Sequence, residues 1–275
     1  MRFRDDSKPR SRYTKCPLTE VVCQLRFPMI LSIDKDLPVS FQELIRRQYP
    51  EYTTNIERQQ QLDFVATPAG VITQPPIQQE NMNHCFTSED GNWQINLTSS
   101  FLALSTRAYD RWEAFRDRLW LPVEALTQCY SPAYYTRVGL RYVDVYDRQK
   151  LGLQGIPWKD LLNSKILGMA AAVNDERDIQ NISQYTEIKL DQYDATMRVI
   201  TNFGATTDNP AQITPDTFIV DTDTYSLSRF PVGREGIQGC LDFMHANSTD
   251  YGRWMVKQKL FEAMEPETIT EEDAS

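Results

Sequence analysis

Hydrophobic and polar residues alternate along several short segments of the chain, as in β-strands that bury one face. Near the start, Val21, Cys23, Leu25 and Phe27 occupy every second position and alternate with Val22, Gln24 and Arg26. Similar patterns occupy segments 61–66, 71–73, 93–98, 101–105, 135–146, 185–190, 195–203 and 217–223. These segments are predicted to be strands whose apolar side chains face one core.

A spacing of three or four residues predicts helices elsewhere. The clearest case begins at Tyr109 and continues through Trp112, Phe115, Leu119, Val123 and Leu126. Ser105 or Thr106 is its predicted cap, and Pro122 is expected to kink or split it, because proline lacks a backbone donor. Shorter helices are predicted over 40–49 and 157–163, followed by two more over 236–245 and from 249 to 264. The polar segment 74–83, with its two prolines, is predicted to be a loop.

The predicted strands follow one another as hairpins, and regular strand–helix–strand alternation is missing. The fold class is therefore α+β, with mainly antiparallel twisted sheets packed by a few helices. With 275 residues and 41% hydrophobic residues, the chain can bury one substantial core. We predict a single domain over 16–264, with a weak internal duplication into sub-halves 16–150 and 156–264 as a further hypothesis.

Charge is distributed unevenly along the chain. The formal net charge is −9, which disfavours tight nonspecific binding to nucleic acid. Residues 1–15 are nevertheless basic and are predicted to form a flexible arm that offers a contact for nucleic acid. Residues 265–275 are acidic and are predicted to form a disordered tail.

Cysteine and histidine usage narrows the chemistry further. The five cysteines are scattered without CxxC spacing, which is typical of reduced thiols in the cytoplasm. With only two histidines, the chain is not expected to bind a metal through clustered ligands, and no cofactor motif is present. No apolar run is long enough to span a membrane, so no membrane partner is expected.

Three stretches resemble a sporadically distributed bacterial and archaeal family of conserved hypothetical proteins of similar length and unknown function. They are 17–22 with Arg26 and Phe27, 101–106 followed by Tyr109, Trp112 and Phe115, and 137–142. The family commonly has asparagine directly after the last stretch, whereas here Asp144 follows one residue later. The resemblance implies a prokaryotic setting, including defence or mobile-element loci.

The leading candidate site is a basic strand face. Arg137 and Arg141 are predicted on the same face of one strand, about 13 Å apart, with Gly139 between them. A glycine there leaves room for a ligand or another backbone, and two guanidiniums can hold a phosphate or carboxylate. The alternative is a solvated face on which the arginines pair with acids such as Asp144 or Glu20.

Two weaker candidates involve carboxylates. Glu187 and Lys189 form a Glu-x-Lys strand motif, which with an upstream acid such as Asp175 or Asp178 is the core of a metal-dependent nuclease site. Asp221 and Asp223 end another predicted strand and are candidate ligands for a hard cation. Both patterns are also typical of ordinary charged strand faces and turns.

These features favour a non-catalytic interaction or scaffold protein that binds a protein partner or itself. One alternative is an accessory protein that binds nucleotides or nucleic acid through Arg137 and Arg141. The second alternative is the metal-dependent nuclease built on Glu187 and Lys189.

Overall fold

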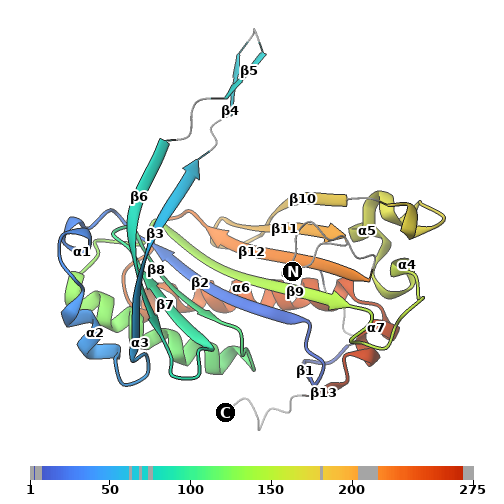
Figure 1. The fold of residues 1–275 in the computed structure, drawn as a ribbon, viewed down its shortest axis with the longest axis horizontal. Helices are drawn as coiled ribbons and strands as arrows, with labels where there is room; N and C mark the ends of the chain where they lie inside the picture. The colour runs from blue at the N-terminus through green and yellow to red at the C-terminus, as the bar shows by residue number, and fades with distance from the viewer. Residues whose placement is uncertain are drawn as a thin grey trace.

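A computed structural model describes residue 3 and residues 8–61, 64–67, 70–73, 77–179, 182–203 and 216–268. Its centre is a nine-stranded antiparallel sheet with the order β10-β11-β12-β9-β2-β8-β7-β6-β3 (Figure 1). The strands of this sheet are β2 (Leu18–Arg26), β3 (Glu51–Gln61), β6 (Ile77–Thr87), β7 (Trp93–Leu97), β8 (Phe101–Thr106), β9 (Arg137–Asp147), β10 (Ile182–Lys189), β11 (Ala195–Phe203) and β12 (Thr217–Ser226). The predicted α+β class, with a mainly antiparallel sheet, is confirmed.

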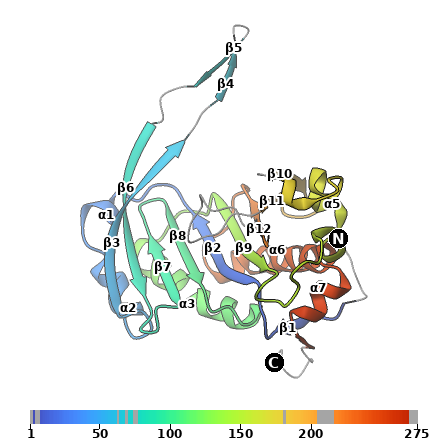
Figure 2. The same cartoon turned by 45° about the vertical axis from the view of Figure 1, so that its right-hand side comes forward.

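Two long helices cover one face of the sheet, and shorter helices flank them (Figure 2). The helices are α1 (Leu31–Lys35), α2 (Val39–Ile45), α3 (Trp112–Tyr130), α4 (Trp158–Leu161), α5 (Ser164–Leu167), α6 (Arg234–Met255) and α7 (Gln258–Ala263), with 3-10 turns η1 (Gly168–Ala171) and η2 (Glu176–Asp178). Two small two-stranded ribbons pair β1 (Ser11–Tyr13) with β13 (Pro266–Thr268) and β4 (Phe64–Thr67) with β5 (Gly70–Thr73). No helix in the described part of the chain is both long and apolar enough to span a membrane.

The order of elements repeats in the two halves of the domain. In the first half, β2 is followed by α1 and α2, then by β3, β6, β7 and β8, and finally by α3. In the second half, β9 is followed by α4 and α5, then by β10, β11 and β12, and finally by α6. β2 and β9 are antiparallel neighbours, and each half places its last strand beside its first. The two halves share this order of elements, although the first contributes five strands to the sheet and the second four.

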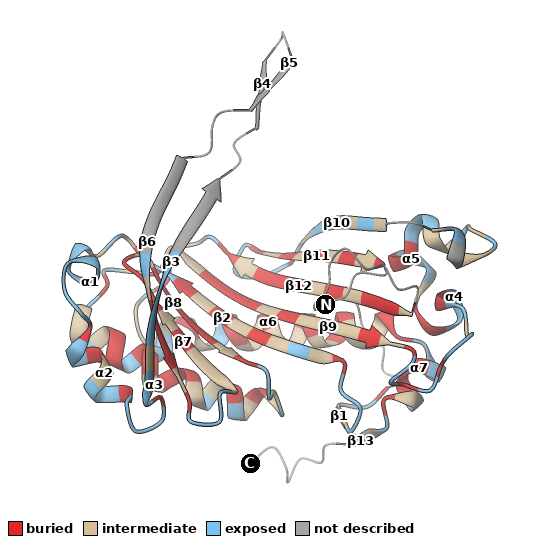
Figure 3. Cartoon of the chain, viewed as in Figure 1, coloured by how far each residue is buried: buried red, intermediate tan, exposed pale blue. Residues whose placement is uncertain are grey.

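The core lies between the sheet and its helices (Figure 3). Cys23 and Leu25 of β2, Leu140 of β9, Phe115 of α3 and Leu241 of α6 have no exposed surface. Full burial of a leucine or phenylalanine side chain stabilises the fold by about 1.5–3 kcal/mol. Among the described residues, α3 and α6 lie on the core side, and no helix packs on the opposite face of the sheet (Figures 1 and 2). We call this the open face.

Helix boundaries differ from the sequence-based prediction at two places. α3 begins at Trp112, with Arg111 at its N-cap position and no side-chain cap. The predicted cap at Ser105 or Thr106 is wrong, because both residues belong to β8. Pro122 lies inside α3, and the helix continues through it instead of splitting. α2 ends at Ile45, four residues before the predicted end at 49.

The two helices predicted near the C-terminus differ as well. Segments 236–245 and 249–255 form one continuous helix, α6. The apolar period fades there because polar residues face the interior and find partners: Ser248 Oγ lies 2.9 Å from Thr224 Oγ1, and Asn247 donates to the Phe243 carbonyl.

The predicted loop over 74–83 is wrong for residues 77–83, which belong to β6 and pair with β3. β3 is the edge strand of the sheet, and its residues 53–56 are all exposed. A strand without a buried face lacks the apolar alternation that identifies strands in a sequence.

The terminal segments also differ from expectation where the structure describes them. Residues 8–15 were expected to form a free arm, but β1 pairs with β13, and Arg10, Arg12 and Lys15 form ion pairs with Glu113, Asp110 and Glu265. Opposite charges on the domain therefore hold this basic segment in place. The rest of the arm, apart from Phe3, and residues 269–275 of the predicted tail lie outside the described residues.

Candidate functional site: an open sheet face and a tyrosine-lined cavity

The predicted pair Arg137 and Arg141 lies on the open face, and each arginine holds its own aspartate from β12. Arg137 Nη2 lies 2.9 Å from both carboxylate oxygens of Asp223, and Arg198 of β11 reaches the same carboxylate at 2.5 Å. Arg141 donates from Nε and Nη2 to Asp221 at 2.8 and 2.7 Å. Both contacts are charge-assisted, and the two-nitrogen pair of Arg141 with Asp221 is also geometrically specific. The hydrogen bond to Asp221 raises the pKa of Arg141.

Gly139 has a different role from the predicted one. A Cβ at this position would lie 2.2 Å from Nη1 of Arg137, so the guanidinium of Arg137 itself fills the space above the glycine. From there it also donates to Gln24 and stacks 5.0 Å from the ring centre of Tyr225. Gly139 therefore makes room for a neighbouring arginine and not for a ligand.

The prediction that Asp144 or Glu20 pairs with the arginines is only partly correct. Glu20 lies 4.0 Å from Arg141 and is a secondary partner. Asp144 is on the other face of β9, between the core residues Tyr142 and Tyr146. The main partners, Asp221 and Asp223, were instead singled out as cation ligands, and both are engaged by arginines.

Glu187 and Lys189 are on β10 at the edge of the sheet, but their contacts differ from those of a nuclease site. Glu187 accepts hydrogen bonds from Tyr185 and Tyr225, at 2.6 and 3.1 Å. Lys189 pairs with Asp194, and both side chains are largely exposed. Among the residues that the structure describes, no three histidine, cysteine or acidic side chains come together as a metal site. The upstream acid and metal cluster that this hypothesis requires are thus not assembled there.

The contacts of both histidines are defined by hydrogen bonds. All five cysteines are free thiols, and His84 is held between the Tyr52 hydroxyl and the Ile33 carbonyl. His245 stacks on Trp112 with ring centres 4.8 Å apart, and its Nδ1 lies 2.8 Å from the Tyr142 hydroxyl. Burial lowers the pKa of His245 to about 3, so this imidazole is neutral near pH 7.

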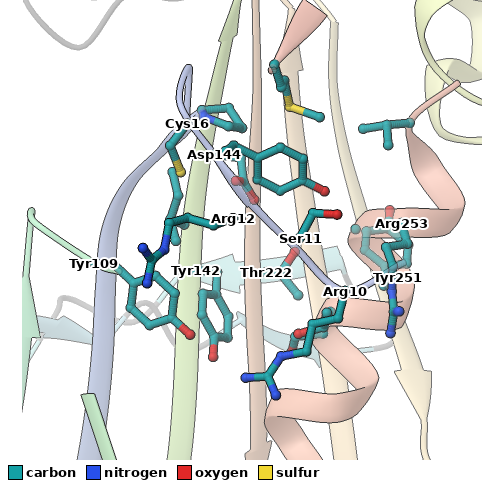
Figure 4. A pocket seen from close by; sticks show the side chains of 18 of the residues that line it. Arg10, Ser11, Arg12, Cys16, Tyr109, Tyr142, Asp144, Thr222, Tyr251 and Arg253 are labelled. Carbon is teal, nitrogen blue, oxygen red and sulfur yellow. The ribbon is translucent and has the colours of Figure 1, made fainter. Parts of the chain in front are cut away.

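A cavity that the sequence analysis missed lies on the helix-covered side of β9. Its volume is about 280 Å³, and it is enclosed by the N-terminal segment 10–18, the sheet and α6. Figure 4 shows Asp144, Tyr142 and Thr222 from the sheet, with Tyr251 and Arg253 from α6 and Ser11 from the N-terminal segment. Tyr13, Tyr109 and Tyr146 also line the cavity. We call it the Asp144 cavity.

A signal for this site was present in the sequence. Tyr142, Asp144 and Tyr146 share the core-facing positions of β9, so strand alternation alone places a carboxylate in an aromatic core environment. Burial raises the pKa of Asp144 to about 7, since an ionised carboxylate is poorly solvated there. The shape of the cavity could not be inferred, because residues 10–18, β9 and α6 are far apart in the sequence.

Comparison of the chain with models of known protein families gives no match. Comparison with functionally curated proteins gives none either.

Proposed function

We propose that this chain is a non-catalytic interaction protein of the cytoplasm that binds another protein through the open face of its sheet. The observation that supports this most directly is that α3 and α6 lie on one face of the sheet (Figure 2), while Arg137, Arg141 and Arg198 form a preordered polar network on the other. Five free thiols are consistent with a reducing compartment. The prokaryotic defence or mobile-element setting implied by the family resemblance remains part of this proposal.

The composition of the open face suits a protein partner. Tyr185 is 61% exposed, and Tyr225 is partly exposed beside Arg137 and Arg198. Tyrosine and arginine are the residue types most enriched in protein–protein interfaces and their energetic centres. Because these side chains already hold one another in place, binding would cost little side-chain entropy.

The charge balance of the same face argues against nucleic acid as its partner. Arg137, Arg141 and Arg198 are interleaved with carboxylates, namely Glu20, Glu187, Asp221 and Asp223. A phosphate backbone requires unneutralised cations. The basic N-terminal segment is also neutralised where it is described, by Glu113, Asp110 and Glu265. The nucleic-acid alternative therefore has less support than a protein partner.

Photo-crosslinking tests the proposal. A photoreactive amino acid is placed at Tyr185 on the open face, and a control is placed at Leu37, which is 66% exposed on the α1–α2 connection. We expect one discrete protein crosslink from position 185 and none from position 37. The crosslinked protein is then identified by mass spectrometry, purified and titrated against the wild type and against Tyr185→Ala with Tyr225→Ala.

The double variant should bind the purified partner at least about tenfold more weakly, as expected for a loss of interface anchors. A crosslink with the mass of two copies of this chain would identify self-association as the interaction. Equal binding by the double variant, or a nuclease-sensitive crosslink at position 185, would overturn the proposal. The latter outcome would favour nucleic acid.

A further inference from the structure

Three arginines that line the Asp144 cavity form ion pairs with acids of the described residues. Arg10 binds Glu113 through both carboxylate oxygens at 2.8 Å, Arg12 pairs with Asp110, and Arg253 pairs with Asp250. Within the described residues, the carboxylate of Asp144 makes no hydrogen bond or ion pair. Among the described residues that line the cavity, Asp144 is therefore an acid without a polar partner.

An unpaired carboxylate inside a protein is unfavourable, because it loses hydration without gaining another partner. Proteins that retain such a group commonly use it to bind a ligand or to carry out chemistry. Among the described residues, no serine, threonine or cysteine side chain is hydrogen-bonded to Asp144 or to His245, whose Nδ1 lies 2.8 Å from the Tyr142 hydroxyl. Nor do the described residues provide three metal ligands together. Binding of an organic cation is the remaining use that matches the charge.

The walls of the cavity point to the same chemistry. Tyr13, Tyr142 and Tyr146 lie close enough to Asp144 for its charge to raise the pKa of each of them. Tyrosine rings attract cations through their faces, by about 0.5–2 kcal/mol each depending on desolvation. A carboxylate beside several aromatic rings is therefore a favourable environment for an ammonium group.

The size and the remaining charges of the cavity limit the ligand. A volume of about 280 Å³ corresponds to the lower end of small-molecule pockets. The other lining carboxylate, Asp110, is already paired with Arg12, so Asp144 can balance one positive charge of a ligand. We propose that the Asp144 cavity binds a small organic compound with a single ammonium group, with Asp144 as its counter-ion and the tyrosine rings as its walls.

This site is separate from the proposed protein-binding face, because Asp144 and Arg141 point to opposite sides of β9. Failure of one proposal therefore leaves the other unaffected.

Calorimetric titration with two simple ammonium probes, benzylamine and tetramethylammonium, tests the site. Benzyl alcohol serves as the neutral isostere of benzylamine. At about pH 8, where Asp144 is ionised, we expect both cations to bind the wild type and benzyl alcohol to bind at least about tenfold more weakly. Asp144→Asn should weaken the binding of both cations by a similar factor. Asp194→Asn is the matched control, because it removes an exposed carboxylate outside the cavity and should change affinity less than twofold.

The pH dependence gives a second readout with tetramethylammonium, whose own charge does not titrate. Affinity should rise between about pH 5 and about pH 8 in the wild type and stay constant in Asp144→Asn. The other titratable groups facing Asp144 do not ionise in this range: burial raises the pKa of Tyr13, Cys16, Tyr142, Tyr146 and Tyr251. His245 is neutral throughout, because burial lowers its pKa to about 3.

Three results would overturn the inference: equal affinity of the two cations for Asp144→Asn and wild type, equal affinity of benzyl alcohol and benzylamine for the wild type, or no binding of either cation at millimolar concentration. Circular dichroism checks that Asp144→Asn is folded. The comparison of benzylamine with benzyl alcohol needs no variant, so it decides the question even if the substitution disturbs the fold.

Discussion

Strand β9 carries charged residues on both faces of the sheet, and these residues are paired on one face but not on the other. On the open face, Arg137 and Arg141 each hold an aspartate of β12 through two hydrogen bonds. On the helix-covered face, Asp144 lines a cavity and has no polar partner among the described residues. The arginines are explained by the contacts that they already make, whereas Asp144 requires either a ligand or a cost in stability. The unpaired charge is therefore the better indicator of a ligand site.

The largest expected effect is on the free energy of unfolding, through the unpaired carboxylate of Asp144. The folded pKa of Asp144 is about 7, above the unfolded value of 3.8, so its contribution to stability is fully present below about pH 4 and is lost as the pH rises through 7. Asparagine carries no charge at any pH. Without ligand at about pH 8, Asp144→Asn should therefore be more stable than the wild type by about 2–4 kcal/mol, measured by urea unfolding.

The difference between Asp144→Asn and the wild type should shrink toward zero at about pH 4. His245 weakens both proteins equally at acid pH, since burial lowers its pKa, and so cancels from the comparison. A variant that is less stable than the wild type at about pH 8 would show that Asp144 has a stabilising partner, and the contrast between the two faces would be lost.

The second expected effect is the loss of stability when an aspartate that pairs with the arginines of the open face is removed. Asp223→Ala leaves Arg137 and Arg198 without their shared carboxylate, and the side chain of Arg137 is only 15% exposed. Removing one partner of a buried ion pair typically costs about 3–5 kcal/mol, so we expect a loss near about 3 kcal/mol in urea unfolding. Asp221→Ala should cost about 1 kcal/mol, because its partner Arg141 is 42% exposed and can be hydrated. Equal losses in the two variants would contradict the assignment of Asp223 as the centre of the network.

A smaller effect is expected at Gly139. An alanine Cβ would collide with the Arg137 guanidinium, which must move and weaken its bond to Asp223, so Gly139→Ala should destabilise by about 1–2 kcal/mol. The same substitution in an Arg137→Ala background should cost less than about 0.5 kcal/mol, since the collision is gone. A cost that persists in that background would show that Gly139 is needed for another reason, such as the close approach of a partner.

The sequence was sufficient to assign residues to the faces of strands but not to identify their partners. Alternation correctly placed Arg137, Gly139 and Arg141 on one side of β9. The same rule places Asp144 on the other side, so it could not have neutralised either arginine. The real partners, Asp221 and Asp223, depend on β12 lying next to β9, and these strands are separated by 69 residues of sequence.

The predicted boundaries of helices and strands were wrong where buried positions carry polar residues or where strand residues are exposed. The edge strand β3 and its partner β6 contain exposed polar residues, and the inner face of α6 contains Asn247 and Ser248, so neither shows a clean apolar period. In both places the tertiary structure supplies hydrogen-bond partners that the local pattern does not reveal. The cavity was even harder to predict from the sequence, because segments 10–18, β9 and α6 meet only in the folded protein.

The smallest expected effect is at Lys189, the residue on which the nuclease alternative depends. Lys189 and Asp194 are 74% and 68% exposed, so their ion pair is strongly screened by water. Lys189→Ala should change the free energy of unfolding by less than about 0.5 kcal/mol, in contrast with the buried network around Asp223. The same protein should show no magnesium-dependent cleavage of DNA or RNA, with or without the substitution. Cleavage by the wild type that disappears in Lys189→Ala would replace the interaction function with the nuclease alternative, and it would mean that an exposed, paired lysine can be more informative than an unpaired buried acid.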